Sequence, residues 1–267
     1  SPTLALTVMR EAAISAFISE PFYTVKIQMD RFTASSERIK SKEEAEKLAA
    51  ACKGAPAVVT KAERKNRKEK PPLLYDLTTL QREANKIMGY TAQQTLDYTQ
   101  SLYEKKMVTY PRTDSRYLTE DMAAMIPDLV QKTAKKFSFS DEAVPVRIGQ
   151  VINNKKVTDH HAIIPTKTAA ETDLSVLPAG EQAVLELIAR RLVCAVGSHC
   201  ESDETAVELS CAGAVFKAKG SIVTEPGWKA FISGTESGKE DKEEDASSIP
   251  DIQNEMELMV REAVCKE

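Results

Sequence analysis

The chain has 267 residues, of which 42% are hydrophobic and 28% are charged. Its 36 basic and 40 acidic residues give a formal net charge of -4, so binding to nucleic acid would need a local basic patch or cations from other parts of the polypeptide. No apolar run approaches the roughly 18 residues that a membrane-spanning helix needs. The start, Ser1-Pro2-Thr3, does not have the basic-then-apolar pattern of a signal peptide.

The five cysteines, Cys52, Cys194, Cys200, Cys211 and Cys265, are scattered and odd in number. The chain has no CxxC pair, which argues against a zinc ribbon and against a disulfide framework. The three histidines lack the HxH or HxxxH spacing of a histidine-rich metal site. We therefore expect free thiols in a reducing compartment, the cytoplasm, and no metal ligands in this chain.

The first sixty residues predict a helix, a β-hairpin, a second helix and a third strand. Ser1 and Pro2 suit a helix start, and alternation at period two predicts half-buried strands. Ser41 is the expected N-cap of the second helix. The expected elements are a helix over 1–17, strands over 22–29 and 31–39, a helix over 41–52 and a strand over 57–60.

Residues 61–70 are dense in charge, and six of the ten are basic. They could form a solvated loop or an edge strand whose charges prevent aggregation, or a surface that contacts phosphates. The composition favours neither interpretation over the other. Pro71-Pro72 then breaks the chain like a hinge.

Two helices are predicted next, each opened by a capping-box pattern. Thr78 with Gln81, and Thr91 with Gln94, have the required spacing. Gly89 should end the first helix. The second should run to about residue 104, with Leu96 and Tyr103 facing inward. With the β-prone run that follows, this order resembles a winged-helix unit.

A further helical region is expected from Asp114, which we interpret as a helix cap in preference to a partner that orients Arg112. Thr119 is a second helix start, and Pro127 either kinks that helix or opens another that runs to Phe137. A loop-rich stretch over 138–156 follows.

A strongly amphipathic helix is predicted after Pro178-Ala179-Gly180, and Gly197 should end it. Its core face carries Val184, Leu185, Ile188, Leu192 and Val196. Arg190 and Arg191 lie near its end, where they should compensate the helix dipole and form a salt bridge.

The rest of the chain is expected to return to β structure. Gly213 and Gly220 should mark turns, and Trp228 should pack on the sheet. Residues 234–248 are acidic and rich in glycine and serine, which predicts a disordered loop. The expected strands lie over 207–209, 215–219, 222–223 and 256–264.

Residues 107–115, Met-Val-Thr-Tyr-Pro-Arg-Thr-Asp-Ser, combine a short β-prone run with a cluster of reactive and charged groups. Pro111 should end the strand, which leaves Tyr110 at its tip and Arg112 on the same side. A free phenol is a poor nucleophile because its pKa is about 10. A neighbouring cation stabilises the phenolate and can hold the phosphate that it attacks, so the pair could accept a phosphodiester. The pattern also fits a surface strand end in which Tyr110 packs and Arg112 pairs with Asp114.

Three segments resemble type IA DNA topoisomerases. Residues 109–115, Thr-Tyr-Pro-Arg-Thr-Asp-Ser, look like the active-site tyrosine motif in the form typical of bacterial topoisomerase III. Residues 159–166, Asp-His-His-Ala-Ile-Ile-Pro-Thr, are similar to the second active-site segment. Residues 2–6 with Arg10-Glu11 resemble the stretch that follows the hinge region. The matches occur in family order and span most of the chain.

The resemblance implies an ATP-independent enzyme that binds single-stranded DNA. It would cut one DNA strand transiently through a 5′-phosphotyrosine link and pass another strand to relax or decatenate DNA. The implied catalytic residues are Tyr110, Arg112 and His160, and the implied DNA-binding residues are Arg112, Thr113, Asp114, Ser115, His160 and Thr166. In the family, Mg²⁺ and a Lys-Glu pair belong to an N-terminal Toprim domain. This chain has no Asp-x-Asp-x-Glu run, so we expect it to be a central fragment, inactive alone and monomeric, whose partners are DNA and the remaining domains of the same polypeptide.

The expected fold is α+β and multidomain, with a β-rich domain interrupted by an inserted, mainly α-helical, winged-helix-like domain that carries the tyrosine. The expected divisions are a leading helix over 1–20, β-rich parts over 21–72 and 181–267, and the inserted domain over 73–180. Two alternatives stay open: a non-catalytic winged-helix DNA-binding module, and a parent enzyme of the reverse gyrase or topoisomerase I kind.

Overall fold

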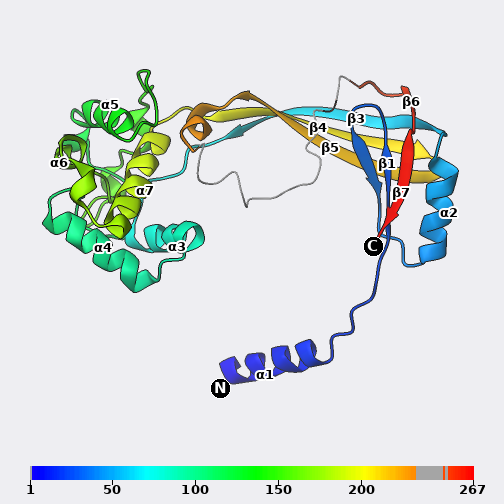
Figure 1. Ribbon diagram of the computed structural model, residues 1–267, viewed down its shortest axis with the longest axis horizontal. Coiled ribbons are helices and arrows are strands. Elements are labelled where there is room, and N and C mark those ends of the chain that lie inside the picture. Colours follow the sequence, from blue (N-terminus) through cyan, green and yellow to red (C-terminus); the bar gives the residue numbers. More distant parts are fainter. Residues whose placement is uncertain (1, 233–248, 250–251) are drawn as a thin grey trace. The chain divides into compact units, whose positions relative to one another are not determined.

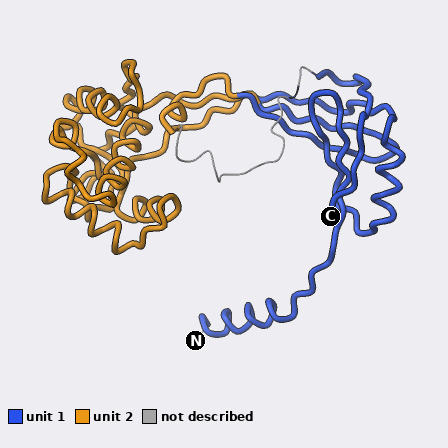
Figure 2. Tube along the Cα trace, in the orientation of Figure 1, with its two compact units in different colours: residues 1–65, 204–222, 243–267 blue, residues 66–203, 223–242 orange. Residues whose placement is uncertain are grey.

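The computed structural model describes residues 2–232, 249 and 252–267. The chain divides into two compact units: one of residues 1–65, 204–222 and 243–267, and one of residues 66–203 and 223–242 (Figure 2). The second unit is thus inserted twice into the sequence of the first. The unit boundaries fall at 65 and 203, whereas the sequence suggested 72 and 180, so helix α7 (Ala179–Ala195) belongs to the second unit.

A curled antiparallel sheet organises the first unit. Its strand order is β6-β3-β4-β5-β2-β1-β7 (Figure 1). The strands are β1 (Thr24–Gln28), β2 (Thr33–Ser36), β3 (Pro56–Glu69), β4 (Cys200–Cys211), β5 (Ala214–Glu225), β6 (Glu257–Met259) and β7 (Glu262–Lys266). Only two residues separate β6 from β7, yet they end opposite sides of the strand order, so the sheet curls until its ends approach. The alternating core side chains Val25, Ile27 and Ala34 confirm the predicted hairpin of β1 and β2.

The predicted last strand, 256–264, is wrong as one element. The backbone N–H of Val260 donates to Ala55 O at 3.1 Å, while that of Arg261 donates to Gln28 O at 2.8 Å. Consecutive residues therefore pair with different strands, and the segment divides into β6 and β7. The predicted turn at Gly220 is also wrong, because β5 continues through this residue. The Gly213 turn is confirmed, with Gly213 at φ +78°.

The basic segment 61–70 lies mostly within β3 and is not a loop. Lys61 and Lys65 both pair with Glu63, at 2.8 and 3.1 Å, and Lys68 pairs with Glu201 at 2.7 Å. Strand β6 pairs only with Pro56–Val58, so the rest of β3 has no partner strand on that side. Lysines on such an exposed edge prevent pairing with other chains. These ion pairs neutralise part of the charge that would face a phosphate.

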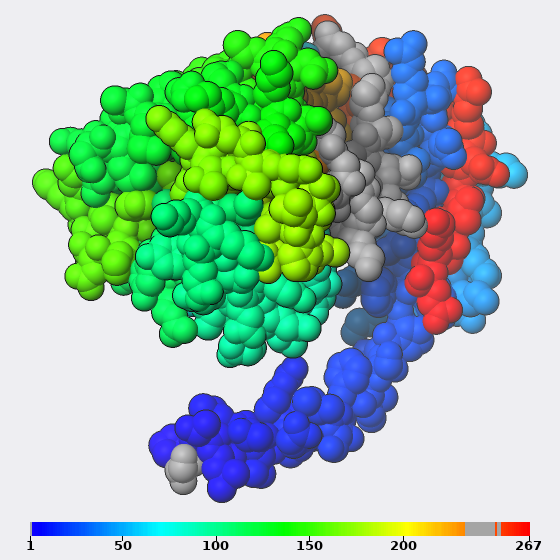
Figure 3. Space-filling view, turned by 60° about the vertical axis from the view of Figure 1, so that its left-hand side comes forward, coloured from blue at the N-terminus to red at the C-terminus, as the bar shows by residue number. Residues whose placement is uncertain are grey.

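The first unit also contains two helices, α1 before the first strand and α2 between β2 and β3. Helix α2 (Lys42–Cys52) is capped by Ser41, as predicted, and packs on β1 and β7. Helix α1 (Pro2–Ser15) has no buried residue, and its Leu4, Leu6 and Met9 are 64%, 68% and 69% exposed. In Figure 3 the dark-blue α1 has no other part of its own unit packed over it on the visible face. Among the described residues, no helix has the length and apolar composition to cross a membrane.

The second unit is a helical assembly around α7, whose predicted core face is confirmed by the burial of Val184, Leu185, Ile188 and Leu192. Helix α7 contacts α3, α4 and α5. The other helices are α3 (Leu77–Met88), α4 (Ala92–Glu104), α5 (Ile126–Lys136) and α6 (Lys167–Glu171), and the 3₁₀ helices span Glu120–Met122, Ile148–Gln150, Asn154–Lys156, Leu174–Val176 and Gly227–Phe231.

Most of the predicted helix ends are confirmed, but the predicted helix starts at Thr78 and Asp114 are wrong. Thr91 and Gln94 form the reciprocal capping box, and Gly89 ends α3 in the left-handed conformation at φ +72°. Helix α3 is capped by Asp76, whose carboxylate accepts from the Thr79 N–H at 2.6 Å, and not by Thr78. Thr78 lies within the first turn of α3, whereas Asp76 stands immediately before the helix, where its carboxylate can accept from a free N–H group of that turn. Pro127 opens α5, as one of the two alternatives proposed.

Trp228 is buried in the Gly227–Phe231 helix against Cys194 and Cys200 of α7 and β4. The described cysteines are all free thiols. Burial raises the pKa of the Cys52 thiol to about 12, so it stays protonated as a small apolar core residue. The disordered loop predicted over 234–248 lies outside the described residues.

Replacing Gly227 with alanine should destabilise the second unit by about 2–3 kcal/mol. Gly227 has φ +52°, and a Cβ there would lie 2.1 Å from the carbonyl oxygen of His199. Chemical unfolding monitored by fluorescence of Trp228, the only tryptophan, measures the change. Gly149→Ala is the matched control, because a Cβ at Gly149 meets no atom within 4 Å. Equal stability of the two variants would contradict this prediction.

Candidate active site

The two motifs singled out in the sequence run antiparallel to each other. A β-bridge joins Val108 to Pro165, and the Thr109 N–H donates to Ile164 O at 3.0 Å while the Thr166 N–H donates to Met107 O at 2.9 Å. The predicted strand over 107–110 is therefore too long, since only this bridge forms. Neither Pro165 nor Pro111 has a backbone N–H to donate, so the pairing cannot extend through either residue.

The hydroxyl groups of two threonines hold the motifs together. Thr109 Oγ1 donates to Ala162 O and accepts from the Ile164 N–H, both at 3.0 Å. Thr113 Oγ1 donates to His160 O at 2.9 Å and accepts from the Ser115 N–H at 3.1 Å. Each hydroxyl acts as donor and acceptor, so no buried hydroxyl group is left unsatisfied at either position. These four bonds hold the His160 backbone beside the tyrosine loop.

The Tyr110 ring is held between two other aromatic rings. His160 lies on one side, with ring centroids 4.3 Å apart and an interplanar angle of 42°. Tyr103, in the last turn of α4, approaches edge-on at 5.4 Å. The prediction that Tyr103 faces inward is wrong, because its side chain is 39% exposed and contacts Tyr110 instead of the core. Edge-to-face aromatic contacts of this kind favour a fixed ring orientation.

A cavity of about 430 Å³ adjoins this aromatic group. Arg112 and His160 line it together with the first turn of α3, and Asp114 and Asp159 line it from their two loops. Arg112 is exposed and Tyr110 half-buried, so solvent reaches both. The cavity therefore has a guanidinium group and an imidazole, which suit a phosphate ester, beside three carboxylates, whose charge opposes an anion.

The predicted site residues do not all meet in this cavity. Thr113 lines it, whereas Ser115 is buried beneath, with its hydroxyl donating to Lys156 O at 2.9 Å. Thr166 lies at the far end of the antiparallel pairing, where its Oγ1 donates to Lys106 O at 2.5 Å. Asp114 does not cap a helix, since the next helical segment begins at residue 120; it accepts from Thr158 Oγ1 at 3.4 Å.

The sequence analysis did not identify three residues that contribute to the site: Tyr103, Thr109 and Asp76. Asp76 could have been found, because an aspartate directly before a helical pattern is a strong N-cap signal. Tyr103 and Thr109 gave no local signal that distinguished them from packing residues. Their roles depend on which segments the fold brings opposite each other.

The described residues do not gather three or more His, Cys, Asp or Glu side chains in a position to hold a metal ion. Asp114 and Asp159 are the only carboxylates besides the capping Asp76 among the described residues around this cavity. This set does not fit a magnesium centre built from the present chain.

Replacing Thr113 with valine should loosen the site while leaving the shape of the side chain almost unchanged. The variant leaves His160 O and the Ser115 N–H without their partner, at a cost of about 1–3 kcal/mol. We expect the imidazole proton resonances of His160 to move, because the ring is no longer held over Tyr110. Thr168→Val, at an exposed position of α6, is the control and should leave both stability and these resonances unchanged.

The comparisons with known proteins agree with one another. The family model described as DNA topoisomerase matches residues 1–267. DNA topoisomerase 3 of Bacillus subtilis (strain 168) is 36% identical over 275 residues, covering 98% of this chain and 37% of that protein. DNA topoisomerase 3 of Staphylococcus aureus (strain MRSA252) is 33% identical over 244 residues, covering 88% and 34%. The chain thus spans about a third of the length of these relatives.

The fold is similar to that of full-length topoisomerase I from Thermotoga maritima, with a TM-score of 0.70. The two chains are 20% identical over a match that covers 99% of this chain and 43% of the other, so this likeness concerns the fold. Family model, curated relatives and fold lead to one conclusion: this chain belongs to the bacterial type IA family of DNA topoisomerases, and its curated relatives are of the topoisomerase 3 kind.

Proposed function

We propose that this chain carries the nucleophile and part of the phosphate-binding site of a topoisomerase that cuts one strand of DNA. The observation that carries the proposal is the contact between Tyr110 and His160, 50 residues apart in sequence, beside a cavity that Arg112 also lines. A tyrosine whose only role is to pack against its neighbours would need neither an exposed arginine nor an open cavity beside it. The half-buried phenol remains accessible to a DNA strand.

In the proposed reaction, Tyr110 Oη attacks the phosphorus of a phosphodiester. The bond from phosphorus to the 3′ oxygen breaks, the departing 3′ oxygen gains a proton to become a hydroxyl, and the phenol loses one. A bond from phosphorus to the tyrosine oxygen replaces the broken bond, which leaves a 5′-phosphotyrosine. One phosphate ester replaces another, so religation reverses the step without ATP.

Arg112 and His160 act on the charge of the phosphate in this scheme. A guanidinium group binds two phosphate oxygens at once and stabilises the additional charge of the transition state. The imidazole, fixed by the Thr113 bond to its backbone, contacts the tyrosine ring and the same cavity.

We further propose that the second unit is the inserted winged-helix-like domain and that the first unit lets it move during strand passage. Because the chain spans 37% of the B. subtilis relative, the remaining part of such a polypeptide would supply Mg²⁺ binding and complete the site. The isolated chain should therefore form no covalent adduct with DNA, even with Mg²⁺. An adduct from the isolated chain would contradict this part of the proposal.

A chimera tests the whole proposal. The aligned third of the B. subtilis enzyme is replaced by this chain, and the protein is incubated with Mg²⁺ and a single-stranded oligonucleotide, then denatured. A 5′-phosphotyrosine link predicts that a 3′-end label stays on the protein while a 5′-end label is released. A folded chimera that binds DNA but retains neither label would favour the non-catalytic winged-helix module.

A further inference from the structure

Among the residues that the structure describes, only one charged residue is buried: Glu181 in the first turn of α7, which is 6% exposed. Its carboxylate accepts from the Ser101 hydroxyl at 2.9 Å and pairs with the Lys105 ammonium group. Both partners lie at the C-terminal end of α4. Replacing a buried ion pair by apolar residues of similar volume is often neutral or stabilising, so stability alone does not account for this charge.

Tyr103 is the residue through which this end of α4 reaches the active site. It lies between Ser101 and Lys105 in the sequence, and its ring contacts the Tyr110 ring edge-on, with centroids 5.4 Å apart. The backbone that carries Tyr110 is held separately, by the bridge from Val108 to the second motif. What α4 adds to the site is therefore the orientation of the Tyr110 ring.

Glu181 and Tyr110 contact opposite sides of the last turn of α4. Ser101 and Lys105 are four residues apart and share one face, whereas Tyr103 lies two residues from each, or about 200° around the helix. Two anchor points on one face resist rotation of α4 about its axis. A rotation of about 20° would move a side chain at the helix surface, roughly 5.5 Å from the axis, by about 2 Å. Such a movement would change the edge-on contact between the two tyrosine rings.

Close packing beside Glu181 makes the start of α7 a fixed support for α4. A Cβ at Gly180 would lie 2.4 Å from the Tyr98 ring of α4, so the two helices approach there as closely as glycine allows. The Tyr98 ring in turn contacts the Tyr90 ring edge-on at 5.4 Å. The carboxylate therefore projects toward α4 from a backbone that has little room to shift.

We propose that Glu181 is a positioning residue for the nucleophile. It fixes the last turn of α4 and, through the Tyr103 ring, the orientation of the Tyr110 ring. It takes no part in making or breaking bonds, since its carboxylate is buried against α4 and does not line the cavity of Arg112 and His160. This role rests on the function proposed above, because it presupposes that Tyr110 attacks a phosphate.

The single-turnover rate of adduct formation in the chimera, at saturating oligonucleotide, tests this role. Glu181→Gln keeps the length of the side chain and an acceptor for Ser101, but it loses the ion pair. We expect a rate about tenfold lower, with unchanged affinity for the oligonucleotide. Lys105→Gln breaks the same pair from its partly exposed end and keeps a donor, so it should slow the reaction about threefold. Glu186→Gln is the matched control: it removes the acidic partner of another basic side chain from α7 and should change neither value.

A mutant cycle separates positioning from a general loss of stability. Tyr103→Leu removes the ring and should slow adduct formation about tenfold. In that background Glu181→Gln should slow it further by less than about twofold, because both changes act through the same ring. Additive losses, about a hundredfold together, would overturn the proposal. An unchanged rate in Glu181→Gln would do the same.

The ring proton resonances of Tyr110 test the contact without the reaction. In the 267-residue chain without DNA, they should move in Glu181→Gln and stay in place in Glu186→Gln. Resonances that stay in place in both variants would overturn the proposal. A parent chimera that forms no adduct, together with resonances that move in Glu181→Gln, would reject the proposed reaction and support Glu181 as the residue that orients the ring.

Discussion

Tyr110→Phe in the chimera should abolish the covalent adduct, a loss of at least about 10⁴-fold. Phenylalanine keeps the ring that contacts His160 and Tyr103, so the aromatic packing stays intact. Only the oxygen that would bond to phosphorus is lost. The measurement is the amount of 3′-labelled DNA that remains on the denatured protein.

Tyr103→Phe is the control for this result. Tyr103 touches Tyr110 edge-on, and its hydroxyl has no place in the proposed reaction, so this variant should form adduct within about twofold of the parent chimera. Adduct formation that survives in Tyr110→Phe would reject Tyr110 as the nucleophile. Equal loss in both variants would mean that the aromatic group, and not the Tyr110 oxygen, is what the reaction requires.

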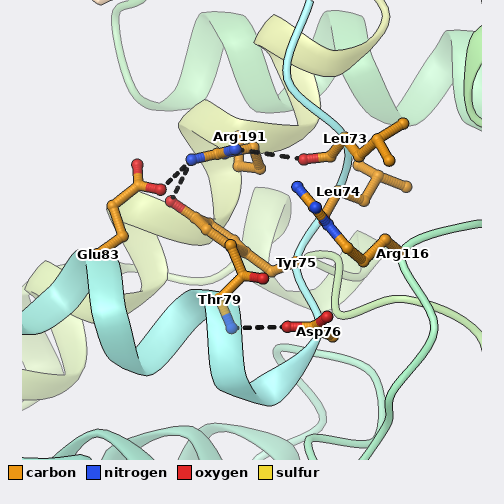
Figure 4. Close-up of polar contacts among 8 residues, drawn as sticks. All are labelled: Leu73, Leu74, Tyr75, Asp76, Thr79, Glu83, Arg116 and Arg191. Atoms are coloured by element: carbon orange, nitrogen blue, oxygen red, sulfur yellow. Dashed lines mark hydrogen bonds and ion pairs between the residues drawn. The ribbon is translucent and has the colours of Figure 1, made fainter.

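Arg191→Met should destabilise the second unit by about 3 kcal/mol. The Arg191 side chain is 12% exposed and that of its partner Glu83 is 22% exposed, so the variant leaves a carboxylate largely shielded from water without a counter-charge. It also removes the donor to Tyr75, which is fully buried (Figure 4). Burial raises the pKa of the Tyr75 phenol well above its ordinary value, so the hydroxyl stays neutral and adds no second negative charge beside Glu83.

The effect should extend to the active site, because Tyr75 O accepts from the Ile163 N–H at 2.8 Å and so supports the segment that carries His160. Unfolding followed by Trp228 fluorescence gives the stability change, and the His160 resonances report the site. Arg191→Met/Glu83→Gln should recover most of the stability, since no unpaired charge remains. A double variant as unstable as the sum of the single ones would show that the ion pair is not the cause.

Arg190→Met is the same chemical change at the next residue and should cost only about 1 kcal/mol. Its partner Glu186 is 46% exposed, so water can solvate the carboxylate once the arginine is gone. Comparing the two variants therefore tests whether burial of the partner carboxylate determines how much stability is lost when its arginine is removed.

The sequence by itself determined the features that depend on neighbouring residues. The Thr91–Gln94 capping box, the Gly89 helix end and the core face of α7 are local, because helix geometry relates residues three or four positions apart. The tyrosine and histidine motifs were likewise visible as short segments, and they indicated the family before the fold was known.

Only the tertiary structure decided the features that join distant segments. The division of 256–264 into β6 and β7, and the single bridge at Val108, depend on which strand or loop lies opposite. The same holds for Tyr103, which local periodicity placed in the core, and for the grouping of Arg112 with His160 around one cavity. Contacts across 50 residues are chosen by the packing of the whole unit, and no local preference of the backbone encodes them.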